Sequence, residues 1–285
     1  MSLVILASRV RTEEKRIITA LERRRVRYDR VDTRRLWSPA AGGSMPWRAV
    51  LNREIGYFRA VYAGRLLEAR GVPVVNTATA TEICGDKWRT TVALLEAGVP
   101  TPRTALALTP DAALDALDGI GYPAVIKPLV GSWGRLVTPV PDPATARAVL
   151  EHVAALPSPQ SHVVYVQELV EQPAGDLRVI VVGDDVVGAV VRRGYGWHAN
   201  VSRGASTEYC TPGLDVTKIA LAAAAATGAD IAGVDLVEDV DGRLLVLEVN
   251  HGVEFAGFQA AQSGRVDVAD RIVEHLLARA EQWCG

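Results

Sequence analysis

The sequence predicts a chain that combines α/β and α+β structure in three consecutive units, and three observations support this prediction. Strand and helix signals alternate through residues 1–85, which is typical of an open α/β unit. Short strands and helices follow in residues 86–165, and strands dominate residues 166–285. With 285 residues and 49% hydrophobic content, the chain can bury a core large enough for two or three units.

The first unit is predicted to hold two strands and two amphipathic helices, at residues 3–6, 13–25, 57–70 and 72–75 in chain order. Its first strand leads into Ala7-Ser-Arg-Val-Arg11, which contains no glycine. The glycine fingerprint of a dinucleotide-binding fold is therefore missing, and a dehydrogenase is disfavoured.

The central unit begins with a helix predicted at residues 86–97, which ends before Gly98 and Pro100. Further helices are predicted at 110–117 and 143–155, with a strand at 124–126, and residues 157–161 are typical of a linker. In the third unit the predicted strands are 163–169, 177–182, 186–192, 231–237 and 244–250. Helices are predicted at 216–227 and 268–283.

Charge and composition restrict the classes of function. The net charge of −2 gives no general attraction to nucleic acid or to an anionic membrane. We find no apolar membrane span and no leader pattern, so we expect a cytoplasmic protein. The arginines at 23–25, 27, 30, 34 and 35 favour a solvated surface over a docking face for an acidic partner. Cys84, Cys210 and Cys284 are far apart in sequence, which favours reduced structural thiols.

The segment from Asp235 to Asn250 is predicted to be a β-hairpin with Asp241-Gly242 as a two-residue turn. That turn places Asp235 opposite Glu248, and Asn250 shares a face with Glu248 because strand side chains alternate. Two carboxylates and an amide oxygen suit a hard cation such as Mg²⁺. An edge hairpin with solvated acids is the alternative, and a shift of one residue in register would disperse the cluster.

Lysine is rare in this chain, since only four of the 31 basic residues are lysines. Lys127 follows the predicted strand at 124–126, and a glycine-containing turn comes directly after it at residues 131–134. A compact ammonium group suits phosphate, so Lys127 and Lys87 are candidate phosphate contacts. The segment does not fit a P-loop, and a plain tight turn remains the alternative.

Two further segments are candidate binding elements. Gln167 and Glu168 end a predicted strand that runs towards Asp176, where an edge backbone and a carboxylate can hold a nucleoside. Residues 192–205 form a polar, glycine-containing loop with three arginines, which can close over a site and bind carboxylates or phosphate. A merely flexible loop is the alternative. The absence of a second histidine near His198 disfavours a zinc site.

Together these segments resemble the ATP-grasp ligases over essentially the whole chain. The motifs that carry the resemblance are Cys84-Gly-Asp-Lys-Trp88, Ile126-Lys-Pro128, Gly131-Ser-Trp-Gly-Arg-Leu-Val137, Asp176-Leu-Arg178-Val and Glu248-Val-Asn-His251. They are similar to those of the LysX/ArgX group, the carrier-protein ligases of lysine and arginine biosynthesis, which are related to RimK. The resemblance implies a Rossmann-like pre-ATP-grasp unit at 1–85 and two ATP-grasp subdomains at 86–165 and 166–285.

The resemblance also implies roles for individual residues. ATP contacts are expected from Lys87, Lys127, the loop 131–137 with Gly131, Ser132, Trp133 and Gly134, and from Gln167, Glu168, Asp176, Arg178 and Asn200. Asp235, Glu248 and Asn250 are expected to bind Mg²⁺, and Arg192 and Arg203 to act in catalysis. Substrate contacts are expected from Arg192, Ser202, Arg203, Glu254, Gly257 and Phe258.

The reaction implied by the resemblance joins an amino acid to a small acidic, LysW-like carrier protein. ATP phosphorylates the side-chain carboxylate of the carrier's terminal glutamate, and the α-amino group of the amino acid attacks the acyl phosphate. Gly257-Phe258 favours glutamate over α-aminoadipate as that amino acid. We expect a homodimer or homotetramer. Two alternatives stay open: a ligase that modifies another protein or peptide, and an ATP-binding regulatory protein without turnover.

Overall fold

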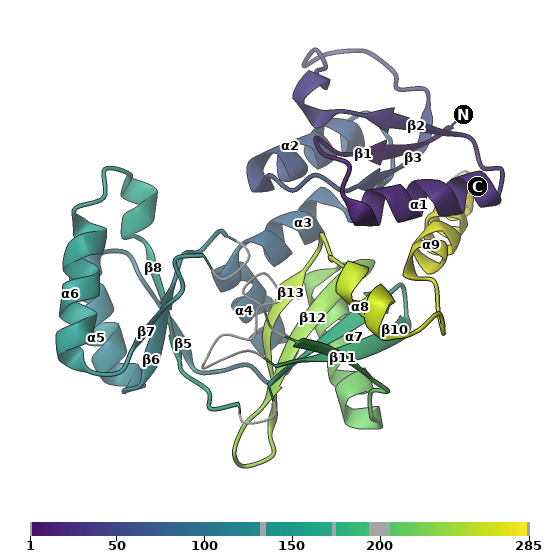
Figure 1. Ribbon diagram of the computed structural model, residues 1–285. Helices are drawn as coiled ribbons and strands as arrows, with labels where there is room; N and C mark the ends of the chain where they lie inside the picture. The colour runs from purple at the N-terminus through teal and green to yellow at the C-terminus, as the bar shows by residue number, and fades with distance from the viewer. Residues whose placement is uncertain (1, 132–134, 173–174, 194–205, 284–285) are drawn as a thin grey trace.

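The computed structural model describes residues 2–131, 135–172, 175–193 and 206–283, and these form three sheets with covering helices (Figure 1). One sheet of four strands has the order β2-β1-β3-β4, another of four has β5-β8-β6-β7, and the sheet of five has β11-β10-β9-β12-β13. The predicted combination of α/β and α+β structure is confirmed. In the described residues, no helix has both the length and the apolar character needed to cross a membrane.

The first sheet is parallel, which agrees with an open α/β unit. Its elements are β1 (Ser2–Leu6), α1 (Thr12–Arg23), β2 (Tyr28–Val31), η1 (Thr33–Arg35), β3 (Trp47–Asn52), α2 (Tyr57–Glu68), β4 (Val74–Val75) and α3 (Ala78–Gly85). The four predicted elements correspond to β1, α1, α2 and β4. The edge strand β2 was not predicted because exposed Asp29 and Arg30 interrupt its apolar pattern.

The central sheet is antiparallel, and helices α5 and α6 pack on it. The elements between residues 86 and 168 are α4 (Lys87–Glu96), β5 (Thr104–Ala107), α5 (Pro110–Ile120), β6 (Ala124–Lys127), β7 (Thr138–Val140), α6 (Pro143–Ala154), η2 (Pro159–His162) and β8 (Val164–Glu168). Strand β8 crosses position 165, where we expected the central unit to end, and it pairs with β5 and β6. Helix α4 packs away from this sheet, since Leu94 shares a core with Ala220 and Val246.

The third sheet is antiparallel and carries six of the polar residues singled out above, namely Asp176, Arg178, Arg192, Asp235, Glu248 and Asn250. Its part of the chain holds β9 (Asp176–Val182), β10 (Asp185–Arg193), β11 (Ser206–Cys210), α7 (Leu214–Thr227), β12 (Ile231–Glu238), β13 (Leu244–Asn250), α8 (Ala256–Ala261) and α9 (Val268–Gln282). The strands predicted at 177–182, 186–192, 231–237 and 244–250 and both predicted helices are present in this unit, while β11 and the short α8 were not predicted. The strand predicted at 163–169 is β8, which belongs to the central sheet instead.

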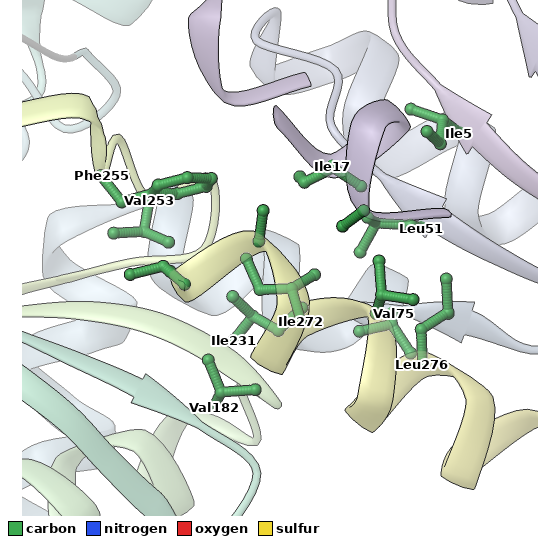
Figure 2. Packing of buried hydrophobic residues seen from close by; sticks show 14 of the residues in the cluster. Ile5, Ile17, Leu51, Val75, Val182, Ile231, Val253, Phe255, Ile272 and Leu276 are labelled. Carbon is green, nitrogen blue, oxygen red and sulfur yellow. The ribbon is translucent and has the colours of Figure 1, made fainter. Parts of the chain in front are cut away.

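A shared core joins the first and third units. Figure 2 shows Ile17 and Leu51 of the first unit gathered with Ile231, Ile272 and Leu276 of the third. Outside this core, the guanidinium of Arg24 bonds Asp270 at 2.8 Å, so part of the arginine-rich surface contacts α9 instead of solvent alone. The first unit is therefore fixed against the third sheet, and its loops can contribute to a site there.

The two described cysteines fit the structural role expected for them. Cys84 and Cys210 carry free thiols. Burial raises the pKa of the Cys84 thiol to about 12, so this side chain is a poor nucleophile. Cys284 lies outside the described residues.

Candidate functional site

The hairpin of β12 and β13 has the predicted register at its polar end. Asp235 lies opposite Glu248 and Gly233 opposite Asn250, and Nδ2 of Asn250 donates to Oε1 of Glu248 at 3.0 Å. The predicted two-residue turn is wrong, because the strands close at Asp239 and Arg243 around three residues, with Gly242 at φ 79°. A bulge at Leu247 in β13 compensates for the extra loop residue and restores the pairing of Asp235 with Glu248.

Asp235 is buried, and two arginines hold its carboxylate. Arg178 on β9 donates to it from Nε and, at 2.7 Å, from Nη2, and Nη2 of Arg192 lies 3.1 Å away. Burial alone would raise the pKa of Asp235, but the charges of Arg178 and Arg192 outweigh this effect and lower it to about 2. The carboxylate is therefore ionised at neutral pH.

Arg192 also binds the second buried carboxylate, Asp176, with two hydrogen bonds of 2.6 Å. Burial and the charge of nearby Asp235 raise the pKa of Asp176 even though Arg192 opposes the shift. Gly175 allows this arrangement, because its φ is 87° and a Cβ there would lie 2.4 Å from the backbone oxygen of Arg192.

The donor set on this hairpin fits a hard divalent cation. Asp235 and Glu248 supply carboxylate oxygens and Asn250 an amide oxygen, which are ligand types that Mg²⁺ prefers. Each oxygen of the Asp235 carboxylate accepts a hydrogen bond from Arg178, so a bound cation would share this carboxylate with the arginine. Within the described part of the chain, no three His, Cys, Asp or Glu side chains form a metal cluster.

The two candidate phosphate lysines lie close together near this hairpin. Nζ of Lys87 donates to the backbone oxygen of Gly131 at 3.0 Å, and its backbone N–H donates to Leu129. Nζ of Lys127 donates to Oε1 of Gln167 at 2.6 Å. Burial lowers the pKa of Lys127 to about 8, and the charge of Glu248 partly opposes this shift.

Gln167 holds Lys127 through a buried network that sequence reasoning missed. Its Nε2 donates to the Thr104 hydroxyl at 3.0 Å and the Tyr165 hydroxyl at 2.9 Å. The Tyr165 hydroxyl shares a further hydrogen bond of 2.8 Å with Thr91. One feature of the sequence could have indicated this network. Tyr165 and Gln167 are two positions apart in a strand, so their side chains lie on the same face of β8.

The remaining nucleotide candidates are only partly described. The carboxylate of Glu168 accepts from the backbone N–H of Arg103 at 2.8 Å and from its Nε at 2.7 Å. Ser132, Trp133, Gly134, Asn200, Ser202 and Arg203 lie outside the described residues, as does most of the loop 192–205.

A single cavity of about 610 Å³ brings the described candidates together. Its lining includes the three hairpin residues, both lysines, Gly131, Gln167, Glu168, Asp176, Arg178 and Arg192. Glu254, Gly257 and Phe258 also line it, and the buried ring of Phe258 packs on Tyr209 with 6.1 Å between ring centroids. The volume is in the range of small-molecule sites.

The first unit supplies one wall of this cavity, which we did not predict. Arg11, Glu13, Glu54 and Tyr57 line it. Glu54 follows β3. Arg11 lies just before α1 and Glu13 lies in its first turn, and this helix follows β1. Polar residues after parallel strands are a general sign of a site at the carboxyl edge of a sheet.

The fold and the cavity define the class of protein. The candidate lysines Lys87 and Lys127 and the carboxylate hairpin line one cavity, an arrangement that fits an ATP-grasp ligase. Residues 84–276 match the RimK-like ATP-grasp domain, and residues 3–83 match the LysX pre-ATP-grasp domain. The chain belongs to the RimK-like ATP-grasp family, and it is an ATP-dependent carboxylate-amine ligase.

Individual relatives cover almost the whole chain. It is 30% identical over 278 residues to the Glutamate--LysW ligase ArgX of Sulfolobus acidocaldarius, covering 97% of this chain and 98% of the relative. The Alpha-aminoadipate--LysW ligase LysX of the same organism is 29% identical, with coverage of 96% and 99%. The crystal structure of a RimK domain ATP-grasp protein from Sphaerobacter thermophilus superimposes with a TM-score of 0.78, at 27% identity and coverage of 97% and 100%.

Proposed function

We propose that this ligase activates the terminal glutamate of a small acidic, LysW-like carrier protein and joins its side-chain carboxylate to the α-amino group of glutamate. The observation that carries the proposal is the single cavity that contains both Lys87 and Lys127 and the Asp235–Glu248–Asn250 hairpin. The names of the full-length relatives support a LysW-type carrier as the partner.

In this proposal ATP lies across the cavity between the two sheets. Lys87 and Lys127 contact its phosphates together with the loop 131–137, and Gln167 keeps the ammonium of Lys127 oriented. Glu168 borders the adenine, while Asp176, Arg178 and Asn200 face the ribose and phosphates. Asp235, Glu248 and Asn250 would hold Mg²⁺, which would offset phosphate charge during transfer.

The carrier's carboxylate then attacks the terminal phosphate of ATP, and ADP leaves. The resulting acyl phosphate carries negative charge that Arg192 and Arg203 stabilise. Attack by the amino group on the acyl carbon forms the amide and releases phosphate. Exclusion of water from the site would protect the acyl phosphate from hydrolysis.

Glutamate is proposed as the amino acid because of the residues after the hairpin. Gly257 and Phe258 line the cavity, with Glu254 beside them and Ser202 expected nearby. Phe258 is buried and lines the cavity, and in this proposal its ring limits the space for a longer side chain. The identities to the glutamate and α-aminoadipate ligases, 30% and 29%, are too similar to decide between these amino acids.

ADP release tests the proposal directly. The purified ligase is incubated with ATP, Mg²⁺, an acidic carrier ending in glutamate, and either glutamate or α-aminoadipate. We expect ADP only when carrier and amino acid are both present, faster release with glutamate, and no release with a carrier lacking its last residue. ADP formed with an unrelated peptide ending in glutamate would favour a general peptide ligase, and no ADP with any acceptor would favour a regulatory protein.

A further inference from the structure

Four hydrogen bonds from the first unit hold the segment that follows the metal-type hairpin. Asn76 donates from Nδ2 to the backbone oxygen of His251 at 2.9 Å, and Arg53 donates from Nη2 to that of Val253 at 3.0 Å. Nη1 of Arg11 donates to Oε1 of Glu254 at 3.0 Å. The backbone N–H of Ala256 donates to Oε1 of Glu13 at 3.1 Å. Residues 251–256 are thus held at four points directly before Gly257 and Phe258.

The groups that make these contacts are themselves fixed. The carboxylate of Glu14 is fully buried and accepts from Nε of Arg53 at 2.9 Å and from Nη2 of Arg11 at 3.0 Å. The Arg53 side chain is only 2% exposed. Because a buried ion pair with complete hydrogen bonding leaves few alternative rotamers, Glu14 determines where both guanidinium groups point.

Asn76 connects the same unit to the other end of the hairpin. Its side chain accepts from the backbone N–H of Ile231 at 2.9 Å and donates to the oxygen of Ile231 at 2.7 Å. Ile231 begins β12 and His251 directly follows β13. The first unit therefore fixes the hairpin at both of its open ends.

Glu13 combines two properties that distinguish it from a packing residue. It is only 5% exposed, yet its carboxylate borders the cavity and accepts a directional hydrogen bond from the backbone just before Gly257. An apolar residue would fill the same space without fixing the direction of that peptide group. A buried carboxylate is costly, so its presence here needs a compensating role.

We propose that Glu13, supported by Arg11 and Arg53, is a positioning residue that sets amino-acid selectivity by fixing residues 253–258. This inference rests on the proposed function and assigns its selectivity partly to the first unit. A small displacement of the segment moves Phe258 and changes the space for the amino-acid side chain. The phosphate lysines belong to other elements, so ATP binding does not depend on Glu13.

A matched pair of variants tests the assignment. Glu13→Gln keeps an oxygen that can accept from Ala256, whereas Glu13→Ala removes it. For each variant, kcat/KM is measured with glutamate and with α-aminoadipate, together with KM for ATP. We expect the glutamate preference to fall by about tenfold in Glu13→Ala, with ATP KM close to that of the wild type, and to be largely retained in Glu13→Gln. An unchanged preference in Glu13→Ala, or an equal loss in both variants, overturns the inference.

Amide hydrogen exchange separates this inference from the proposed function. The Ala256 amide should exchange faster in Glu13→Ala than in the wild type or in Glu13→Gln, whether or not the protein turns over a carrier. Equal protection in all three proteins overturns the inference. A wild type that releases no ADP with any carrier contradicts the proposed function, and in that case the exchange measurement still decides whether Glu13 holds the segment.

Discussion

Arg178 holds the carboxylate of Asp235 through two donor nitrogens, from directly opposite positions on β9 and β12. The carboxylate expected to bind Mg²⁺ is thus paired with a cation of the protein itself. This pairing keeps the buried Asp235 carboxylate ionised, as metal binding requires. The guanidinium of Arg178 also competes with a metal for that carboxylate.

Replacing Arg178 with Gln should destabilise the protein by about 3 kcal/mol, because Asp235 loses its main partner while remaining buried. Mg²⁺ alone should stabilise this variant more than the wild type, since the guanidinium of Arg178 no longer competes for the carboxylate and Arg192 contacts it at the longer distance of 3.1 Å. Urea unfolding with and without Mg²⁺ measures both effects. Arg243→Gln is the control, because Arg243 is 70% exposed in its pair with Asp239 and its loss should have a much smaller effect on stability. Equal Mg²⁺ effects in Arg178→Gln and the wild type would contradict competition for Asp235.

The affinity for ATP should depend on pH through Lys127. Its pKa of about 8 in the free protein lies below the usual value, so the ammonium is present below pH 8 and is lost as the pH rises through 8. Calorimetric titration should show ATP affinity falling up to about tenfold between pH 7 and pH 9. Lys127→Met should bind weakly at every pH, while the exposed Lys218→Met should follow the wild type. A sloped profile in Lys127→Met would assign the titration to another group.

Shortening Phe258 should relax the choice of amino acid. Phe258→Leu enlarges the cavity beside Gly257, which gives room for the additional methylene of α-aminoadipate. The ratio of kcat/KM for glutamate to that for α-aminoadipate should fall to about a tenth of its wild-type value. Phe58, which is 69% exposed, provides the control variant Phe58→Leu. If the ratio in Phe258→Leu stays at the wild-type value, the ring does not limit the site.

The core between the first and third units should unfold as one unit. Leu276→Ala removes a fully buried side chain from that core and should cost about 2–5 kcal/mol (Figure 2). Leu214→Ala, at a residue that is 79% exposed, should cost under about 0.5 kcal/mol. Denaturation is followed by fluorescence and by far-UV circular dichroism. Separate transitions for the two probes would show that the units unfold independently.

Local sequence patterns were sufficient to predict structural features that depend on a single helix or strand. Helix α4 begins after Asp86, which accepts from the N–H groups of Trp88 and Arg89, and it ends before Gly98 at φ 69°. The hairpin register was predicted from an assumed two-residue turn at Asp241-Gly242. The predicted turn was one residue too short, and the bulge at Leu247 corrected the register in a way that no local pattern indicates.

Contacts between segments that are far apart in the chain could not be predicted from the sequence. Arg11 and Glu254 are 243 positions apart, and Glu13 lies as far from Ala256. No periodicity predicts that α1 approaches the segment after β13, since this depends on how α9 packs the third unit onto the first. Gln167 was expected beside adenine, and its bond to Lys127 depends on the pairing of β8 with β6.

The central claim is that the Asp235–Glu248–Asn250 hairpin supports ligation, and mass spectrometry of the carrier tests it most directly. With ATP, Mg²⁺ and glutamate, the wild-type protein should add one glutamate residue to the carrier. Glu248→Ala should add none while keeping the wild-type circular dichroism spectrum, and Glu238→Ala, at the exposed end of β12, should retain activity. Carrier modification by Glu248→Ala at a rate near that of the wild type would contradict the account.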